Sequence, residues 1–506
     1  MQQPRVKLVL SGLLLAILMA AMDNTIVATA LGSILADLGG VENYIWITSA
    51  YAVAVLAGMP IFGKLSDMYG RKRFFVFGLA LFLIGSALCG IADTIPQLAA
   101  YRAIQGIGGG ALMPIAFTIV FDIFPPEQRG KMTGLFGAVF GASSILGPLL
   151  GAFITDTFSW NWVFYVNIPL GIVSLVLVWL YYHESTEHSK QKIDWLGSIS
   201  LVTAVVSLMF ALELGGKEYE WTSWIILGLF AVFAVFLIVF FFAEKRAAEP
   251  IISFWMFKSK LFASSQVLAF VYGATFVGLT IFIPLFVQSV YGGSATNAGI
   301  ILMPMLLGSV VGSAFAGIMQ TKWAYRKIMA VSVVVYAIGM VLMSTISPET
   351  DRLLLTVYMT LVGIGVGFSF SLLPSASVHK MDFRHRGSAN STNAFFRSLG
   401  LAIGITVFGA IQTKLLQNQL DKDLGNAGGG SFSPDNLQNV FEPAQRNLIP
   451  PNILEKIIDA MAVSISSTFF WSLIPIAIAA IAVYTMGNER LLTEKKSDAP
   501  AEGVTE

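Results

Sequence analysis

Two charged residues within long apolar stretches are the positions at which this sequence is best placed to do chemistry. Asp23 lies in an apolar segment near residues 8–36, and Arg102 lies in another near residues 95–121. A charge at the centre of a bilayer costs about 3 kcal/mol on insertion scales, so ionisable residues there mark proton or ion pathways. Apolar surroundings also favour the neutral, protonated form of the Asp23 carboxyl group. A group that alternates between its neutral and charged forms is able to couple proton entry to helix movement.

Each of these charges has a second, structural interpretation. Asp23 either binds a proton or cation, or is a structural acid that pairs permanently with a base or caps a helix break. Arg102 is either a partner of that acid or a hydrogen-bonding strut between helices. Arg397 either contacts substrate or a second acid, or extends toward the outer surface. Glu213, near the outer end of an apolar run, is interpreted as interfacial.

The elements that carry these residues are predicted to be transmembrane helices. The chain has 506 residues, of which 56% are hydrophobic and only 12% are charged. Charged residues make up about 25% of a typical soluble domain. Apolar runs of about 18 to 25 residues recur along the chain, the length that spans a bilayer as a helix. Lipid offers no partners to exposed backbone groups, so these runs must be helices and the fold an all-α polytopic membrane protein.

The sequence predicts fourteen spans, with both chain ends in the cytoplasm. They lie near residues 8–36, 44–63, 74–92, 95–121, 131–155, 162–182, 195–214, 222–242, 262–290, 296–319, 328–347, 353–378, 388–411 and 462–487. With this topology, 23 of the 31 Lys and Arg residues lie in cytoplasmic segments, six lie outside and two lie within spans. This is the asymmetry of the positive-inside rule. Omitting one span would reverse every later loop and destroy it.

An internal repeat organises these spans. A shift of 257 positions pairs Tyr101 with Tyr358, Gly106 with Gly363, Gly108 with Gly365, Gly110 with Gly367, Arg129-Gly130 with Arg386-Gly387, and Gly147 with Gly404. The fourth and fifth spans thus repeat as the twelfth and thirteenth. Parallel halves with substrate bound between them are a known transporter plan. The repeat places Met359 opposite Arg102, so we expect the coupling chemistry in the first half.

The predicted organisation follows from the repeat. A six-helix bundle (residues 1–182) is followed by a linker with two extra helices (183–260) and a second six-helix bundle (261–487). The second bundle includes an extracellular loop at 412–461, and residues 488–506 form a cytoplasmic tail.

Two further segments have a physical interpretation of their own. The loop after the second span contains Gly63, Asp67, Gly70 and Arg71. Its glycines allow close approach of helix ends, and its acid can pair with an arginine or cap a helix. The fifth span carries Gly134, Gly147, Pro148 and Gly151. Glycines at near-helical spacing permit tight packing, and the proline bends the helix.

These segments together resemble a known family. The loop Gly63-Lys-Leu-Ser-Asp67-Met-Tyr-Gly70-Arg71 resembles the signature loop of the major facilitator superfamily, and Arg102-Ala-Ile-Gln105-Gly106 resembles its R-x-x-q-G element. The fifth span is similar to the glycine–proline pattern of its antiporters. Met22-Asp23-Asn24-Thr25, Trp160 to Pro169 and Asp194-Trp195-Leu196-Gly197 resemble the fourteen-helix drug:proton antiporters of the EmrB/QacA type. Asn161 stands where that family usually has a basic residue, and the counterpart loop from Gly317 to Lys327 lacks its acid.

The resemblance implies proton-coupled efflux of small hydrophobic or amphiphilic compounds by alternating access, with multidrug specificity. It implies that Arg102 helps Asp23 release its proton, and that the fifth span seals the cavity. We expect a mostly apolar cavity whose polar positions include Asn24, Thr25, Gln288, Asn390, Asn393 and Arg397. The same machinery serves equally for a dedicated exporter of one lipid-like metabolite, siderophore or antibiotic. A receptor or sensor that retains a transporter fold is a more distant alternative.

Other function classes find no support in the sequence. No nucleophile–base arrangement and no metal cluster lies within the spans, so an enzyme is not expected. His183 and His188 are five residues apart, which does not place them on one helix face. A net charge of +1 gives no indication of a nucleic-acid partner. The expected partners are substrate, protons and lipid in a bacterial inner (plasma) membrane, with no cofactor and no obligatory protein partner. The proton gradient is the expected energy source.

Overall fold

The computed structural model describes residues 3–39, 45–184, 192–292, 295–424 and 450–491, and these are almost entirely helical. The elements are α1 (Gln3–Leu38), α2 (Ile45–Tyr69), α3 (Arg71–Cys89), α4 (Ile95–Ile123), α5 (Pro126–Thr157), α6 (Trp162–Tyr165), α7 (Asn167–Tyr181), α8 (Trp195–Leu214), α9 (Trp224–Arg246), η2 (Phe254–Lys258), α10 (Lys260–Ser289), α11 (Ala295–Met319), α12 (Tyr325–Met343), α13 (Arg352–Ser377), η3 (Phe383–His385), α14 (Arg386–Leu424), α17 (Pro451–Trp471) and α18 (Leu473–Thr485). Within this part of the chain, 14 helical segments are long and apolar enough to cross a membrane, which is the predicted number. The sixth of these segments combines α6 with α7, and the last combines α17 with α18.

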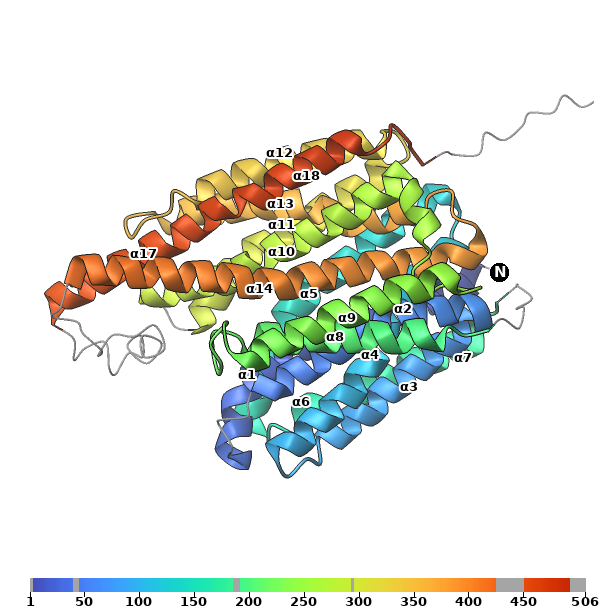
Figure 1. The fold of residues 1–506 in the computed structure, drawn as a ribbon, viewed down its shortest axis with the longest axis horizontal. Coiled ribbons are helices and arrows are strands. Elements are labelled where there is room, and N and C mark those ends of the chain that lie inside the picture. Colours follow the sequence, from blue (N-terminus) through green and yellow to red (C-terminus); the bar gives the residue numbers. More distant parts are fainter. Residues whose placement is uncertain (1–2, 40–44, 185–191, 293–294, 425–449, 492–506) are drawn as a thin grey trace, which may run out of the picture.

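The helices form two sets that pack in the same way. In the first set α1 packs on α5, and α2 and α3 pack on α4. In the second set α10 packs on α14, and α11 and α12 pack on α13. The blue helices α1 and α3 of the first set and the helices α12 and α18 of the second lie on opposite sides of the molecule (Figure 1), and α5 packs on α11 between them. A sixth helix completes each set, because α7 packs on α1 and α3, and α18 packs on α10 and α12. The fold is therefore two six-helix bundles, as the repeat predicts.

Glycines fix the register of this repeat. A Cβ atom added to Gly106 of α4 would lie 2.5 Å from the carbonyl oxygen of Tyr51 on α2. A Cβ atom added to Gly363 of α13 would lie 2.0 Å from the carbonyl oxygen of Met305 on α11. Without a hydrophobic driving force between helices in lipid, such backbone approach is a main source of helix association. The glycine pairs found in the sequence are thus equivalent contacts in the two bundles.

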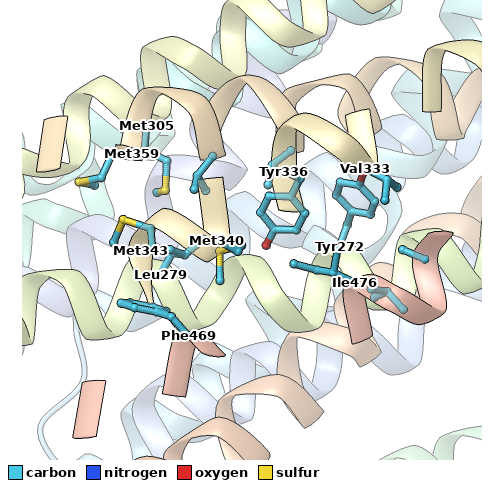
Figure 2. Close-up of a cluster of buried hydrophobic side chains, with 14 of the residues drawn as sticks. Tyr272, Leu279, Met305, Val333, Tyr336, Met340, Met343, Met359, Phe469 and Ile476 are labelled. Carbon is cyan, nitrogen blue, oxygen red and sulfur yellow. The ribbon is translucent and has the colours of Figure 1, made fainter. Parts of the chain in front are cut away.

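The second bundle has a core rich in methionine. Met305, Met340, Met343 and Met359 lie with Phe469 in one buried cluster (Figure 2). Methionine fills irregular spaces without adding charge. Met359 is the repeat partner of Arg102, so the second bundle has a packed apolar core at the position where the first has a charge.

The two additional helices lie between the bundles in sequence and beside the seam between them in space. α8 packs on α9 and also contacts α2 of the first bundle and α14 of the second. α9 leaves large apolar side chains such as Leu227, Val235 and Ile238 exposed, as a lipid-facing helix does. Its last turn carries Lys245 and Arg246, and the negative C-terminal end of the helix dipole stabilises both positive charges.

Two predicted boundaries are wrong. The segment after residue 63 is helical, since α2 continues to Tyr69 and only Gly70, with φ 113°, separates it from α3. The proposed loop 412–461 is also helical at both ends, because α14 continues to Leu424 and α17 begins at Pro451. Leu416 and Leu420 join a buried cluster with Ile457, and this packing stabilises the extensions. Residues 425–449 of that loop, and residues 492–506 of the tail, lie outside the described residues.

Candidate functional site: a buried ion pair beside a central cavity

Asp23 of α1 and Arg102 of α4 form an ion pair inside the first bundle. Both side chains are inaccessible to solvent, and Nη1 of Arg102 donates to Oδ2 of Asp23. Oδ1 of Asp23 accepts from Nε2 of Gln105 at 2.8 Å and from Nδ2 of Asn167 at 2.9 Å. Three N–H donors and one positive charge thus stabilise the ionised carboxylate in this conformation. The sequence analysis left open whether Asp23 pairs with a base, and in the conformation described its partner is Arg102.

Other groups hold Arg102 in place. Its Nε donates to the carbonyl oxygen of Ile47 at 3.1 Å, and its Nη1 also donates to Oε1 of Gln105 at 2.7 Å. The ring of Tyr51 lies 4.1 Å from its Cζ atom, a cation–π distance. Ser86 of α3 accepts from Nδ2 of Asn167 at 3.0 Å. The network therefore joins α1, α2, α3, α4 and α7, and a change at Asp23 acts on all five helices.

A cavity of about 220 Å³ lies between the two bundles, next to this network. Its lining comes from α1, α2, α4 and α5 of the first bundle and from α13 and α14 of the second. Asn24, the chain neighbour of Asp23, lines it, and so does Tyr51, which touches Arg102. The cavity and the network around the ion pair thus share α1, α2 and α4, while Asp23 itself stays buried.

The cavity surface is mostly apolar and aromatic. Phe140 of α5 and Phe370 of α13 face each other across the bundles with ring centroids 6.0 Å apart, and Phe117 and Phe136 pack at 4.9 Å. Weakly directional contacts of this kind suit amphiphilic ligands of varied shape, and a few polar groups fix their orientation.

Four of the six polar positions expected in the cavity lie in its lining, namely Asn24, Asn390, Asn393 and Arg397. Thr25 instead lies against α5, where its Oγ1 donates to the carbonyl oxygen of Met22 at 2.9 Å. Gln288 is near the end of α10, outside the lining.

The two asparagines of α14 are held by protein groups. Nδ2 of Asn390 donates to the carbonyl oxygen of Pro114, across the bundle interface, at 3.2 Å. Nδ2 of Asn393 donates to Oε1 of Gln266 at 3.2 Å.

At the face where the N-terminus lies, Asp67 joins the two bundles. Its carboxylate accepts the backbone N–H groups of Gly387 at 2.8 Å and Ser388 at 2.7 Å, in the first turn of α14. These N–H groups have no partner within their own helix, and the helix dipole adds to the attraction. Gly63 allows this contact, because a Cβ atom there would lie 2.0 Å from Oγ of Ser391.

Arg71 extends this connection. It is fully buried, and its Nη2 donates to Asp67 at 3.3 Å and to the carbonyl oxygen of Phe383 at 2.5 Å. Arg71 also forms an ion pair with Asp122 at the end of α4, and Asp122 accepts from Arg386 of α14 at 3.3 Å. The positive-inside rule assigns this face to the cytoplasm, so these contacts hold the two bundles together on the cytoplasmic side.

The glycines of α5 contact two different helices. Added Cβ atoms would lie 1.9 Å from Oγ1 of Thr25 at Gly147 and 2.1 Å from Oγ1 of Thr29 at Gly151, so both glycines pack on α1. Gly134 faces Ala314 of α11 in the second bundle instead. Pro148 lies inside α5, between the two glycines of the α1 contact.

Several residues of these networks did not stand out as site residues in the sequence. Asn167 and Gln105 were seen only as parts of family-like segments, Arg386 only as a repeat position, and Asp122 was not singled out at all. The available signal for Asn167 was an amide near the start of an apolar run. Among the described residues no group of three or more His, Cys, Asp or Glu is placed to hold a metal ion.

Comparison with known proteins decides the family. A family model described as Major Facilitator Superfamily matches residues 13–197 and again residues 195–405. The chain belongs to the major facilitator superfamily. It is a multi-pass membrane transporter and not an enzyme, and the two successive matches agree with the two bundles.

Relatives within the superfamily match almost the whole chain. "Multidrug resistance protein 3" of Bacillus subtilis (strain 168) is 59% identical over 497 residues, which are 97% of each chain. "Multidrug transporter protein MdtP" of the same organism is 33% identical over 98% of this chain and 96% of the relative. The resemblance inferred from the motifs is confirmed.

Solved structures of the superfamily share the fold at low identity. The human organic anion transporter MFSD10 matches with a TM-score of 0.64 at 14% identity, over 94% of this chain and 100% of that chain. The proton:xylose symporter XylE matches with a TM-score of 0.62 at 12% identity, over 97% and 98%. At these identities the likeness shows the fold alone.

Proposed function

We propose that this protein exports small hydrophobic or amphiphilic compounds of many kinds across the cell membrane in exchange for protons. The observation that carries the proposal is the buried Asp23–Arg102 pair beside an apolar cavity between the two bundles. The names of the two Bacillus subtilis relatives support the multidrug part. The proton part rests on the chemistry of the pair.

The pair is a binding site for which a proton and Arg102 compete. In the conformation described, the carboxylate has Arg102 as its counter-ion, which is the arrangement expected before a proton arrives. A proton from the outer side that binds Asp23 neutralises the carboxylate and removes the attraction to the guanidinium. Return of Arg102 to Asp23 expels the proton toward the cytoplasm. Because separation of buried opposite charges is costly, the proton drives the rearrangement of α1 against α4.

Substrate binding is coupled to the ion pair by the helices that line the cavity and also carry residues of the network. Asn24 and Tyr51 line the cavity on α1 and α2, and Tyr51 also contacts Arg102. Movement of these helices on protonation therefore changes the cavity. In the same cycle the contacts of Asp67 and Arg71 with α14 must break for the cavity to open to the cytoplasm. The proton and the substrate each bind the two states of the rocking bundles with different affinities. This difference couples the binding of one to the binding of the other.

The test is transport by the purified protein in proteoliposomes with an imposed pH gradient. We expect wild-type protein to move several chemically unrelated amphiphilic dyes against their gradients, and an uncoupler to abolish this. Asp23→Asn should lose uphill transport. Asp37→Asn is the matched control, because Asp37 is on the same helix but bonds only Trp160 at the outer end among the described residues.

The outcomes separate the possible functions. Uphill transport that persists in Asp23→Asn, or survives the uncoupler, removes proton coupling through Asp23. Transport of a single compound from a broad panel assigns a dedicated exporter instead. Binding without movement of any compound assigns a receptor.

A further inference from the structure

Arg397 is a cation in the cavity wall that has no acidic partner among the residues the structure describes. It lies on α14, lines the cavity and is only partly accessible. Its Nη2 donates to the carbonyl oxygen of Ser369 at 3.1 Å, and its Cζ lies 4.9 Å from the ring centroid of Phe370. Within the described part of the chain it forms no ion pair. This differs from Arg102, whose charge is balanced by Asp23.

The rest of the cavity does not balance this charge either. Among the described residues that line the cavity none is an Asp or a Glu, and Arg397 is the only Lys or Arg. Asp23, the chain neighbour of Asn24, is not in the lining, because it is buried and paired with Arg102. The cavity therefore carries a net positive charge in an apolar setting, where bulk water screens it poorly.

The guanidinium of Arg397 also has N–H donors that the described hydrogen bonds do not use. An arginine side chain offers five N–H donors in a planar fork, of which the described structure uses one. That fork matches a carboxylate or sulfonate, which can accept two parallel hydrogen bonds. An uncompensated charge at this depth is expensive, and a charge of this kind usually marks a ligand site.

We infer that Arg397 is the anion-binding subsite of the cavity and takes the acidic group of an amphiphilic substrate. The inference rests on the proposed function and names one substrate class, amphiphiles that combine an aromatic body with a carboxylate or sulfonate. The aromatic body lies against Phe140 and Phe370, whose ring centroids are 6.0 Å apart, and the Phe370 ring lies beside the guanidinium. The anion neutralises Arg397 without touching the Asp23–Arg102 pair.

The main competing explanation is structural, because Arg397 also ties α14 to α13 through Ser369. A strut would support all ligands equally. An anion subsite favours only ligands that carry the acid. The test therefore needs two ligands of the same shape that differ only in the anionic group.

8-Anilinonaphthalene-1-sulfonate and N-phenyl-1-naphthylamine are such a pair, and both fluoresce on binding. Binding to purified protein in detergent needs no proton gradient. We expect Arg397→Gln to weaken binding of the sulfonate by about tenfold more than binding of the neutral amine, as loss of a charged hydrogen-bond partner implies. Arg397→Lys should recover part of the preference. Arg352→Gln is the control, since Arg352 packs on Tyr291 outside the cavity lining and should not change the ratio.

A second variant leaves Arg397 in place. Asn393 lines the cavity four residues earlier on α14, so Asn393→Asp supplies an isosteric carboxylate on the same helix face. Asn393→Asp should also selectively weaken binding of the sulfonate, because the new carboxylate competes with the sulfonate for the guanidinium. Equal loss of both ligands in Arg397→Gln, or undiminished sulfonate binding in both variants, overturns the inference. Failure of wild-type protein to transport either ligand uphill counts against the proposed function instead.

Discussion

Arg102 of α4 and Met359 of α13 occupy equivalent positions in the two bundles, and only Arg102 is charged. Their helix neighbours differ in the same way, because Tyr51 lies on Arg102 and its counterpart Met305 joins a methionine cluster with Met359 (Figure 2). A Cβ atom added to Gly147 would contact the carbonyl oxygen of Met22, and one added to its repeat partner Gly404 would contact that of Ala274. Met22 and Ala274 are therefore equivalent, and so are the residues that follow them, Asp23 and Thr275. One bundle thus carries a titratable pair and the other an apolar core.

This asymmetry predicts the behaviour of Arg102→Met, which gives the first bundle the residue of the second. We expect destabilisation of about 3–5 kcal/mol, because Asp23 is left buried without its counter-ion. The double variant Asp23→Asn/Arg102→Met should recover most of this stability but no uphill transport. Thermal unfolding in detergent and dye efflux measure the two effects. Recovery of transport in the double variant would show that the pair is only structural.

The architecture was predictable from the sequence for a physical reason. Lipid requires long apolar helices, and the Lys and Arg distribution fixes their direction, so fourteen spans followed from composition and length alone. The glycine pairs gave the repeat, because close helix contacts tolerate no side chain. The ends of α2 and α14 were missed because polar residues there suggested loops, although tertiary contacts keep both helices intact.

The site was predictable only in part. Asp23, Arg102 and Asp67 stand out because charge is rare in or near a span. Their partners do not, since Asn167 and Asp122 lie 144 and 51 residues away from Asp23 and Arg71 in the chain, and no local pattern links them. The cavity lining could be predicted for α14, where Asn390, Asn393 and Arg397 share one face. Thr25 was misjudged because one residue along α1 turns the side chain toward α5.

The contact of Asp67 with α14 predicts how the cavity opens. Asp67→Asn removes the charge that accepts two N–H groups from the start of α14, so the closed state at the N-terminal face should lose stability. Cys89 is the single cysteine and is buried, so Ser398→Cys in the cavity lining can be labelled selectively. We expect Asp67→Asn to increase labelling by an impermeant maleimide in inside-out vesicles by about tenfold. Asp93→Asn, on an exposed loop, is the control, and equal rates in both variants contradict the prediction.

The seam between α1 and α5 predicts a strict need for glycine. Gly151→Ala would place a Cβ atom 2.9 Å from the carbonyl oxygen of Ile26 and 2.1 Å from Oγ1 of Thr29, so α5 must move away from α1. We expect a loss of about 1–3 kcal/mol in stability and a faster passive proton leak in proteoliposomes. Gly32→Ala is the matched control, since nothing lies within 4 Å of its added Cβ atom. A tight, fully stable Gly151→Ala protein would show that the seam does not depend on this glycine.

Asn167 supplies the last prediction, because it contacts the pair without carrying a charge. Asn167→Leu keeps the approximate shape but removes the N–H that Asp23 accepts at 2.9 Å and the bond to Ser86 at 3.0 Å. The ionised carboxylate then keeps two donors, so Arg102 competes less well with a proton and release to the cytoplasm slows. We expect uphill efflux to fall by about tenfold while dye binding is retained, as for loss of one charged hydrogen bond. Ser174→Ala removes a buried hydrogen bond from the same helix to Gly12, away from the pair, and should leave efflux within about twofold of wild type. If Ser174→Ala and Asn167→Leu lose transport equally, the effect belongs to α7 packing and not to the carboxylate.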